Sequence, residues 1–158
     1  MAWPTTLQST QAERVVAENT KVRIYAPALY VTTFDYDFAV SGGAISAITV
    51  SSQDVPVGAQ VVGGWYQVST TFITGGADAG TIALSIVGAN DLVTAIAVSD
   101  ASNPWDIDLT QRKPLKRVVT KIATAVPVVL TIAGQTVSAG VLFGCVEWVL
   151  PQNLSSGH

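Results

Sequence analysis

Apolar and polar residues alternate along most of the chain, most regularly between Val61 and Val87. This stretch predicts two β-strands joined by a glycine-rich loop, because strict period-two alternation of β-branched and aromatic residues between glycines is typical of strands. One face of the first strand carries Tyr66, Val68, Thr70 and Phe72, and one face of the second carries Ile82, Leu84 and Ile86. The residues expected in the core are Tyr66, Val68, Phe72, Ile82, Leu84 and Ile86. Since a two-stranded unit is not stable alone, the remaining strands must cover these faces.

Shorter alternating stretches predict further strands on both sides of this pair. They are residues 21–25, 34–40, 44–50, 118–124, 128–132 and 141–149. In the stretch 34–40 the residues expected to point inward are Phe34, Tyr36, Phe38 and Val40. The pattern is weaker over residues 89–104, where we expect loop with either one short strand or one helical turn.

Roughly seven to nine short strands with turn residues between them predict an all-β fold, an antiparallel β-sandwich or jelly roll with little helix. A chain of 158 residues has the length of one domain. We expect an N-terminal arm or extension over residues 1–20, a single β-sandwich domain over 21–151 and a flexible C-terminal tail over 152–158. Residues 1–20 are interpreted as either a frayed end or an ordered arm.

The composition is more apolar and less charged than that of an ordinary globular protein. Hydrophobic residues make up 49% of the chain and charged residues 12%, whereas about 25% charged is usual. No apolar run approaches the ~20 residues of a membrane helix, and the first ten residues do not resemble a secretory signal. Low charge fits a well-filled sandwich, a surface buried in an assembly, or both, and it favours a homo-oligomer.

Few residues suit catalysis or metal binding. Cys145 lies in an apolar run and is interpreted as a small buried hydrophobe. His158 is the last residue, so the folded body lacks the commonest general base. The sequence has two Asp-x-Asp pairs, Asp35/Asp37 and Asp106/Asp108. Ca²⁺ needs six to eight oxygen ligands, so we interpret the pairs as surface carboxylates and assign no catalytic residue, metal ligand or cofactor.

Positive charge is concentrated in one segment. There is no Lys or Arg between Ile24 and Gln111, and five of the eight basic residues then follow: Arg112, Lys113, Lys116, Arg117 and Lys121. One interpretation is an edge strand protected from edge-to-edge pairing by lysines and Pro114. The other is a docking patch for an acidic partner or for a neighbouring copy. The net charge of −3 argues against binding to nucleic acid.

Aromatic residues suggest two further interpretations. Trp3 and Leu7 stand in an otherwise polar N-terminal segment, which is typical of an anchor for a partner's pocket. Trp65, Tyr66 and Trp105 would suit a sugar-stacking platform if they were exposed, although aromatic side chains in sandwiches more often belong to the core.

Four stretches carry a family resemblance: YDFAVSGGAISAITV, GWYQVSTTFITGGADAGTIALSI, SDASNPWD and LTIAGQTVSAGVLFGCVEWV. Over about residues 34–149 the chain resembles small β-rich virion proteins of tailed bacteriophages, in which such chains serve as capsid decoration (cement) proteins or related accessories. The resemblance implies a sandwich that oligomerises, as a trimer rather than a dimer, and adds to a preformed capsid. Its partner would be the major capsid protein.

The residues and the resemblance together predict a non-enzymatic virion protein on the capsid exterior, made in the host cytoplasm without a signal peptide. Neither a nucleic acid nor a membrane is expected as a partner. Docking is assigned to Trp3, Leu7, Arg112, Lys113, Lys116, Arg117 and Lys121. A tail or baseplate structural module and a carbohydrate-binding β-sandwich module remain as alternatives.

Overall fold

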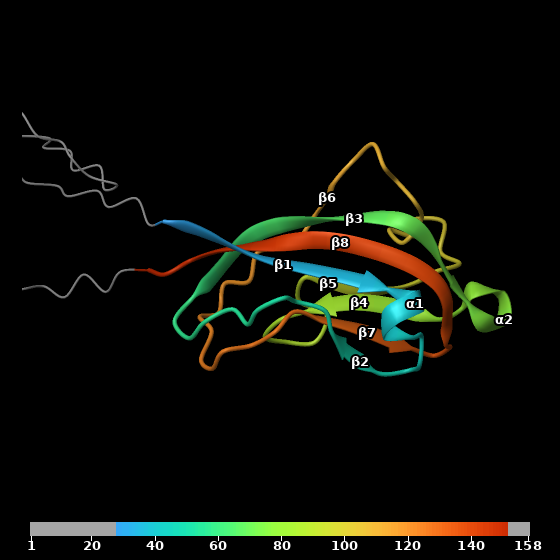
Figure 1. Cartoon of the computed structure of the whole chain (residues 1–158), viewed down its shortest axis with the longest axis horizontal. Helices are drawn as coiled ribbons and strands as arrows, with labels where there is room; N and C mark the ends of the chain where they lie inside the picture. Colours follow the sequence, from blue (N-terminus) through green and yellow to red (C-terminus); the bar gives the residue numbers. More distant parts are fainter. Residues whose placement is uncertain (1–27, 152–158) are drawn as a thin grey trace, which may run out of the picture.

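The computed structural model describes residues 28–151 (Figure 1). Its elements in chain order are β1 (Leu29–Asp37), α1 (Phe38–Ser41), β2 (Ala47–Thr49), β3 (Gln60–Thr74), α2 (Gly75–Asp78), β4 (Thr81–Ser85), β5 (Val93–Ala97), β6 (Lys113–Pro114), β7 (Val129–Ala133) and β8 (Val137–Val149). The predicted arm (1–20), the predicted strand 21–25 and the predicted tail (152–158) lie outside the described residues. Within the described range, no helix has the length and apolarity that would span a membrane.

The strands form two four-stranded antiparallel sheets, ordered β1-β8-β3-β6 and β2-β7-β4-β5. Figure 1 shows the two sheets as stacked layers, with β1, β8 and β3 in one and β4, β7 and β2 in the other. The two helices have four residues each. The predicted all-β antiparallel sandwich with little helix is therefore confirmed.

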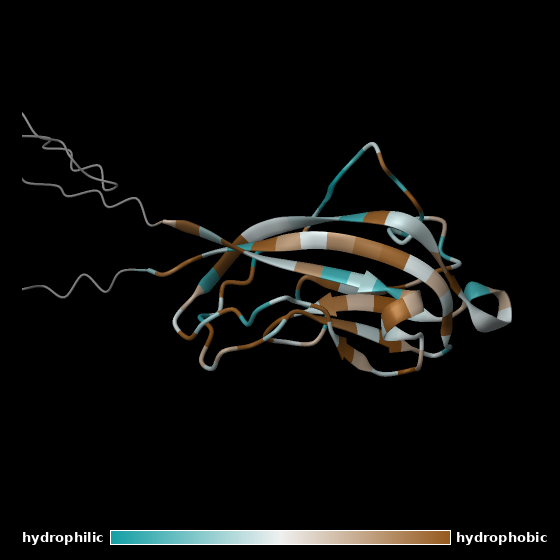
Figure 2. Cartoon of the chain, viewed as in Figure 1, coloured by the Kyte–Doolittle hydropathy of each residue, from teal (hydrophilic) through white to brown (hydrophobic). Residues whose placement is uncertain are grey.

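Buried apolar side chains from both sheets form one core cluster between the layers. Figure 2 shows apolar residues along much of β8, which is interrupted by polar residues such as Ser138 and Glu147. The predicted core residues that are buried are Tyr66, Val68, Phe72, Ile82, Leu84 and Ile86. Thr70 lies on the same predicted face of the strand but is exposed, because the pairing of β3 with β8 shifts register on both sides of it. A β-bulge of this kind interrupts the period-two alternation.

The strands β3 and β4 do not form a pair, although the sequence predicts them as one unit. β3 pairs with β8 and β6, whereas β4 pairs with β5 and β7 in the other sheet. The glycine-rich connection passes through consecutive residues with positive φ, Gly76, Ala77 and Asp78. The Asp78 carboxylate accepts a hydrogen bond from the Thr74 backbone N–H at 2.7 Å, which fixes this turn between the sheets.

The predicted strand 34–40 begins earlier and ends earlier than expected. β1 ends at Asp37, whose carboxylate accepts a hydrogen bond from the Ala39 backbone N–H at 2.8 Å and so caps α1. Phe34 and Tyr36 are buried as predicted. The prediction that Val40 points inward is wrong, because Val40 lies on α1 and is 84% exposed.

The predicted strand 118–124 is absent from the described fold. Just before this stretch, Leu115 N–H donates to Gly64 O on β3, and Lys116 N–H donates to Leu92 O, next to the start of β5. Val118 N–H then donates to Val61 O, back at β3. No continuous ladder forms, and the segment instead closes one side of the sandwich. In the undecided stretch 89–104, the structure places one short strand, β5.

Candidate docking surface

The outer face of the β1-β8-β3-β6 sheet carries a group of three large side chains, of which Arg112 and Phe143 are exposed and Trp65 is partly buried. Trp65 on β3 lies edge-on to Phe143 on β8, with ring centroids 6.0 Å apart and planes at 89°. The Arg112 guanidinium carbon lies 3.9 Å from the centre of the Trp65 ring. We call Trp65, Arg112 and Phe143 the Trp65 cluster.

The strand period places Trp65 on this face. Tyr66 and Val68 of the same strand point into the core, so their odd-numbered neighbours face outward. Gly64 allows the close approach of β3 to β8, because a Cβ on Gly64 would lie 2.2 Å from the Cys145 carbonyl oxygen. The sheet therefore presents the indole on a rigid support rather than on a loop.

Arg112 and Trp65 stabilise each other's orientation. A guanidinium over an indole contributes roughly 0.5–1 kcal/mol at an exposed site. Trp and Arg are also the residue types most enriched among the side chains that dominate binding energy at protein interfaces. The sequence pattern does not reveal this pair, because its members are distant along the chain and no motif links them.

Cys145 lies on the same outer face, paired with Trp65 across the β3–β8 ladder. Its side chain is nonetheless buried, which confirms the interpretation as a small buried hydrophobe. Burial, together with the nearby negative charge of Glu147, raises the pKa of the Cys145 thiol. The thiol is therefore less acidic than that of a free cysteine.

The other basic residues do not join the Trp65 cluster. The Lys113 ammonium donates hydrogen bonds to the carbonyl oxygens of Pro104 and Asp106, and partial burial lowers its pKa. Lys116 donates to Thr94 Oγ1 on β5. Arg117 and Lys121 are exposed. The basic segment is thus spread along the side of the sandwich, and its two-residue strand β6 forms the edge of one sheet.

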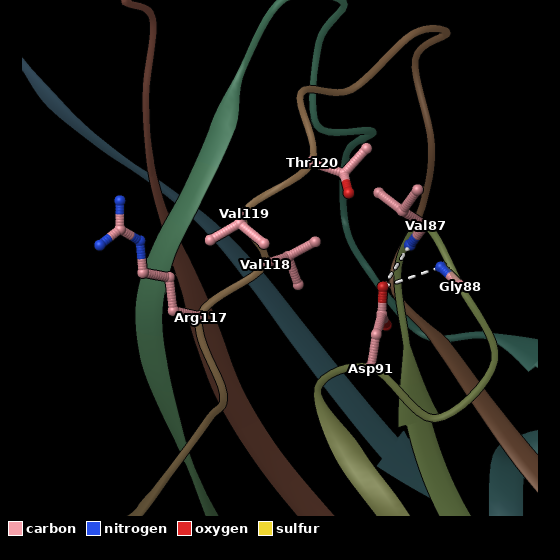
Figure 3. A pocket seen from close by; sticks show the side chains of 7 residues that line it. All are labelled: Val87, Gly88, Asp91, Arg117, Val118, Val119 and Thr120. Carbon is pink, nitrogen blue, oxygen red and sulfur yellow. Dashed lines mark hydrogen bonds between the residues drawn. The ribbon is translucent and has the colours of Figure 1, made fainter.

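A shallow apolar cavity of about 290 Å³ lies near the end of this segment (Figure 3). It is lined by Val87, Gly88, Asp91, Arg117, Val118, Val119 and Thr120. The Asp91 carboxylate accepts hydrogen bonds from the backbone N–H groups of Val87 and Gly88, so its charge serves to hold the loop. The Arg117 head group points away from Asp91 in Figure 3.

The remaining candidate residues are placed as follows. Trp105 and Tyr66 are buried against each other, with ring centroids 5.7 Å apart, so the proposed sugar-stacking platform is wrong for these two residues.

Asp108 accepts hydrogen bonds from the Thr110 backbone N–H and hydroxyl. Among residues 28–151, no group of three or more potential metal ligands is found. Trp3 and Leu7 lie outside the described residues.

Comparisons with known proteins show that the fold of this chain is similar to that of known structures. No protein-family model matches the chain, and no curated protein matches it in sequence. A chain of the cyanophage Pam1 capsid asymmetric unit is similar over 94% of this chain and 100% of its own length, with a TM-score of 0.58 and 20% identity. A chain of the acidic stable capsid of the Helicobacter pylori bacteriophage KHP30 is similar over 80% of this chain and 92% of its own length, with a TM-score of 0.54 and 13% identity.

At these identities the two structures establish the fold, which this chain shares over most of its length with chains from two phage capsids. The sequence resemblance to phage virion proteins is thereby matched by structural neighbours of the same kind.

Proposed function

We propose that this protein is a non-enzymatic structural component of a phage virion, which docks on the outside of the capsid and reinforces it. The observation that carries the proposal is the similarity of its whole sandwich to chains in two phage capsid structures. The low fraction of charged residues, 12%, supports a surface that is partly buried in an assembly. The partner is the major capsid protein, and the site of synthesis is the host cytoplasm.

Docking occurs through the Trp65 cluster, supplemented by the exposed basic residues. A standard protein interface buries about 800 Å² per partner, and the four-stranded outer face provides a continuous platform of residues for such a contact. A stacked Trp–Arg pair contributes chiefly by slowing dissociation, whereas the peripheral charges of Lys116, Arg117 and Lys121 act on association rate and salt sensitivity. Trp3 and Leu7 remain proposed anchors in the N-terminal segment.

Reinforcement follows from repetition of the contact. Each copy adds a modest binding free energy, and linked copies add avidity when they engage neighbouring sites on the shell together. This is the reason to propose a homo-oligomer, with a trimer favoured over a dimer.

The proposal is tested by binding to capsids that lack the protein. Trp65→Ala should weaken binding at least about tenfold, mainly through faster dissociation. Arg112→Lys keeps the charge but loses the planar stacking group, so we expect a smaller loss. Val57→Ala removes an exposed apolar side chain (60% exposed) in the loop that precedes β3 and is the control. Unchanged dissociation for Trp65→Ala would exclude the cluster as the docking surface.

The peripheral charges have a separate signature. Reversing the charges of Lys116, Arg117 and Lys121 should slow association and flatten its salt dependence. Lys113 is left intact in this variant, because its ammonium holds the carbonyl of Pro104. Deleting residues 1–10 should speed release if Trp3 and Leu7 are anchors. If both variants bound capsids as well as the parent protein does, neither the peripheral charges nor the N-terminal anchors would contribute to the contact.

A further inference from the structure

We propose that the first half of β1 pairs with the same segment of a second copy, in a two-fold antiparallel arrangement centred on Tyr30. This contact would join the β1-β8-β3-β6 sheets of two molecules into one continuous sheet. The inference concerns self-association and does not depend on whether the protein binds a capsid.

The outer edge of β1 is covered along only part of its length by the described residues. Asp35 N–H donates to Val50 O, and Thr33 O accepts from Ser52 N–H, both on the edge away from β8. Odd-numbered residues of β1 therefore direct their backbone polar groups outward. By the same alternation the N–H and C=O groups of Leu29 and Val31 face that edge, where no other described residue bonds to them.

The side chains along the open edge are apolar and exposed. Leu29 is 57% exposed, Tyr30 44% and Val31 54%. Tyr30 stacks on Trp148 with ring centroids 4.6 Å apart, and Trp148 is fixed by its indole N–H, which donates to Thr32 Oγ1 at 3.0 Å. An exposed apolar edge strand without Lys, Pro or a bulge is a template for pairing with another strand.

The open edge is complementary to itself. With Tyr30 opposite Tyr30 of the second copy, Leu29 of each molecule lies opposite Val31 of the other, and each such pair exchanges two backbone hydrogen bonds. Beyond Val31 the next outward-facing residue of β1 is Thr33, whose carbonyl oxygen already accepts a hydrogen bond from Ser52 N–H. The pairing of the two copies therefore ends before Thr33.

Charge also favours a second copy as the occupant. The described segment before Asp35 carries no charged side chain, so two copies pair here without repulsion, although the chain as a whole has a net charge of −3. Three residues from each copy bury far less than the ~800 Å² per partner of a stable interface. In solution the pairing should therefore appear only at high protein concentration. In the proposed homotrimer, whose subunits would be held together by another surface, this β1 pairing would connect one trimer to the next.

The test combines hydrogen exchange with sedimentation of the full chain at about 10 μM and about 1 mM, concentrations that bracket a weak association. We expect the amides of Leu29 and Val31 to exchange at least about tenfold more slowly at the higher concentration. Val31→Lys, which introduces a charge at the edge, should abolish this change. The matched control is Val40→Lys, at an exposed valine on α1, which should behave like the parent.

Val31→Pro provides a second variant, because the N–H that it removes faces the open edge and not β8. It should likewise abolish concentration-dependent protection. Three outcomes would overturn the proposal. If the amides of Leu29 and Val31 exchanged slowly at both concentrations, the chain's own terminal segment would cover the edge. If they were protected only when the protein is bound to capsids, a strand of the shell would cover it. Self-association that survives both Val31 variants would place the contact elsewhere.

Discussion

Ala77 adopts a backbone conformation that alanine rarely takes, with φ of 64° and ψ of 35°. It stands between Gly76 and Asp78, which also have positive φ, in the connection that carries the chain from one sheet to the other. For a residue with a Cβ, the left-handed region costs roughly 1–2 kcal/mol. The crossover between the sheets is therefore locally strained, and the hydrogen bonds of Asp78 and Thr74 hold it in place.

Ala77→Gly should raise the free energy of unfolding by about 1 kcal/mol, because glycine removes the Cβ clash at a cost in chain entropy that is smaller than the relief. Urea denaturation measures the change. Ala79→Gly is the control, since Ala79 has an ordinary φ of −80° and its replacement should destabilise slightly. A loss of stability in Ala77→Gly would contradict the left-handed geometry.

Tyr66 gives the fold a specific sensitivity to alkaline pH. Burial raises the pKa of its hydroxyl from 10.0 to about 12. Below pH 10 the hydroxyl is protonated in both states, so its contribution to stability is complete. Between pH 10 and about 12 the unfolded chain ionises while the folded chain does not, so stability falls as pH rises.

Tyr66→Phe should therefore reduce the steepness of the loss of stability between pH 10 and 12. Unfolding free energies measured across this range, with pH 8 as the reference, give the comparison. Tyr36→Phe should also reduce the slope, because the pKa of Tyr36 is raised to about 12 by burial and by Asp37. It should in addition cost stability at pH 8, since the Tyr36 hydroxyl donates to Gly42 O. An unchanged slope in Tyr66→Phe would mean that its hydroxyl is accessible to water.

At the scale of elements, β8 is the strand around which its sheet is built, because it pairs with β1 on one side and β3 on the other. Gly144 lies at its centre, opposite both Phe34 and Tyr66. A Cβ there would stand 2.2 Å from the Trp65 carbonyl oxygen and 2.7 Å from the Phe34 ring. Close approach of β3 to β8 therefore requires glycine at this position.

Gly144→Ala should lower the free energy of unfolding by roughly 1–3 kcal/mol, since backbone and an aromatic ring must both move to admit one methyl group. Gly63→Ala, in the neighbouring strand, is the control: a Cβ at Gly63 meets nothing within 4 Å. Thermal or urea unfolding of the two variants distinguishes them. Equal stabilities would show that the two strands are less closely packed than described.

The sequence predicts strands well where one face is buried, and poorly where the chain changes partner. The alternation through Tyr66, Val68 and Phe72 is visible in the sequence because a buried face imposes period two. The assignment of β3 and β4 to different sheets is invisible, because the same alternation serves a hairpin or a crossover. The stretch 118–124 also has the alternation of a strand, but its backbone hydrogen bonds, from Val118 to Val61 and between Ile122 and residues 58–59, are isolated and form no ladder.

At the scale of the whole molecule, the sandwich closes its sides with irregular segments. Residues 115–118 link β3 to the chain before β5, and residues 50–52 link β1 to the chain before β7. These closures leave two surfaces suited to protein partners, the outer face with the Trp65 cluster and the open edge at Leu29–Val31. The sequence indicated a docking role for Arg112 through charge, but only the fold places it on Trp65.

The central claim is that the protein is a structural component of the capsid exterior. Cryo-electron microscopy of virions with and without the protein tests it directly, with the parent and Trp65→Ala compared in re-addition to depleted particles. We predict density for a two-layered β-sandwich on the outer surface of the head, with the Trp65 cluster toward the shell, that disappears when the protein is absent. Density on the tail, or heads that are identical in the two preparations, would contradict the account.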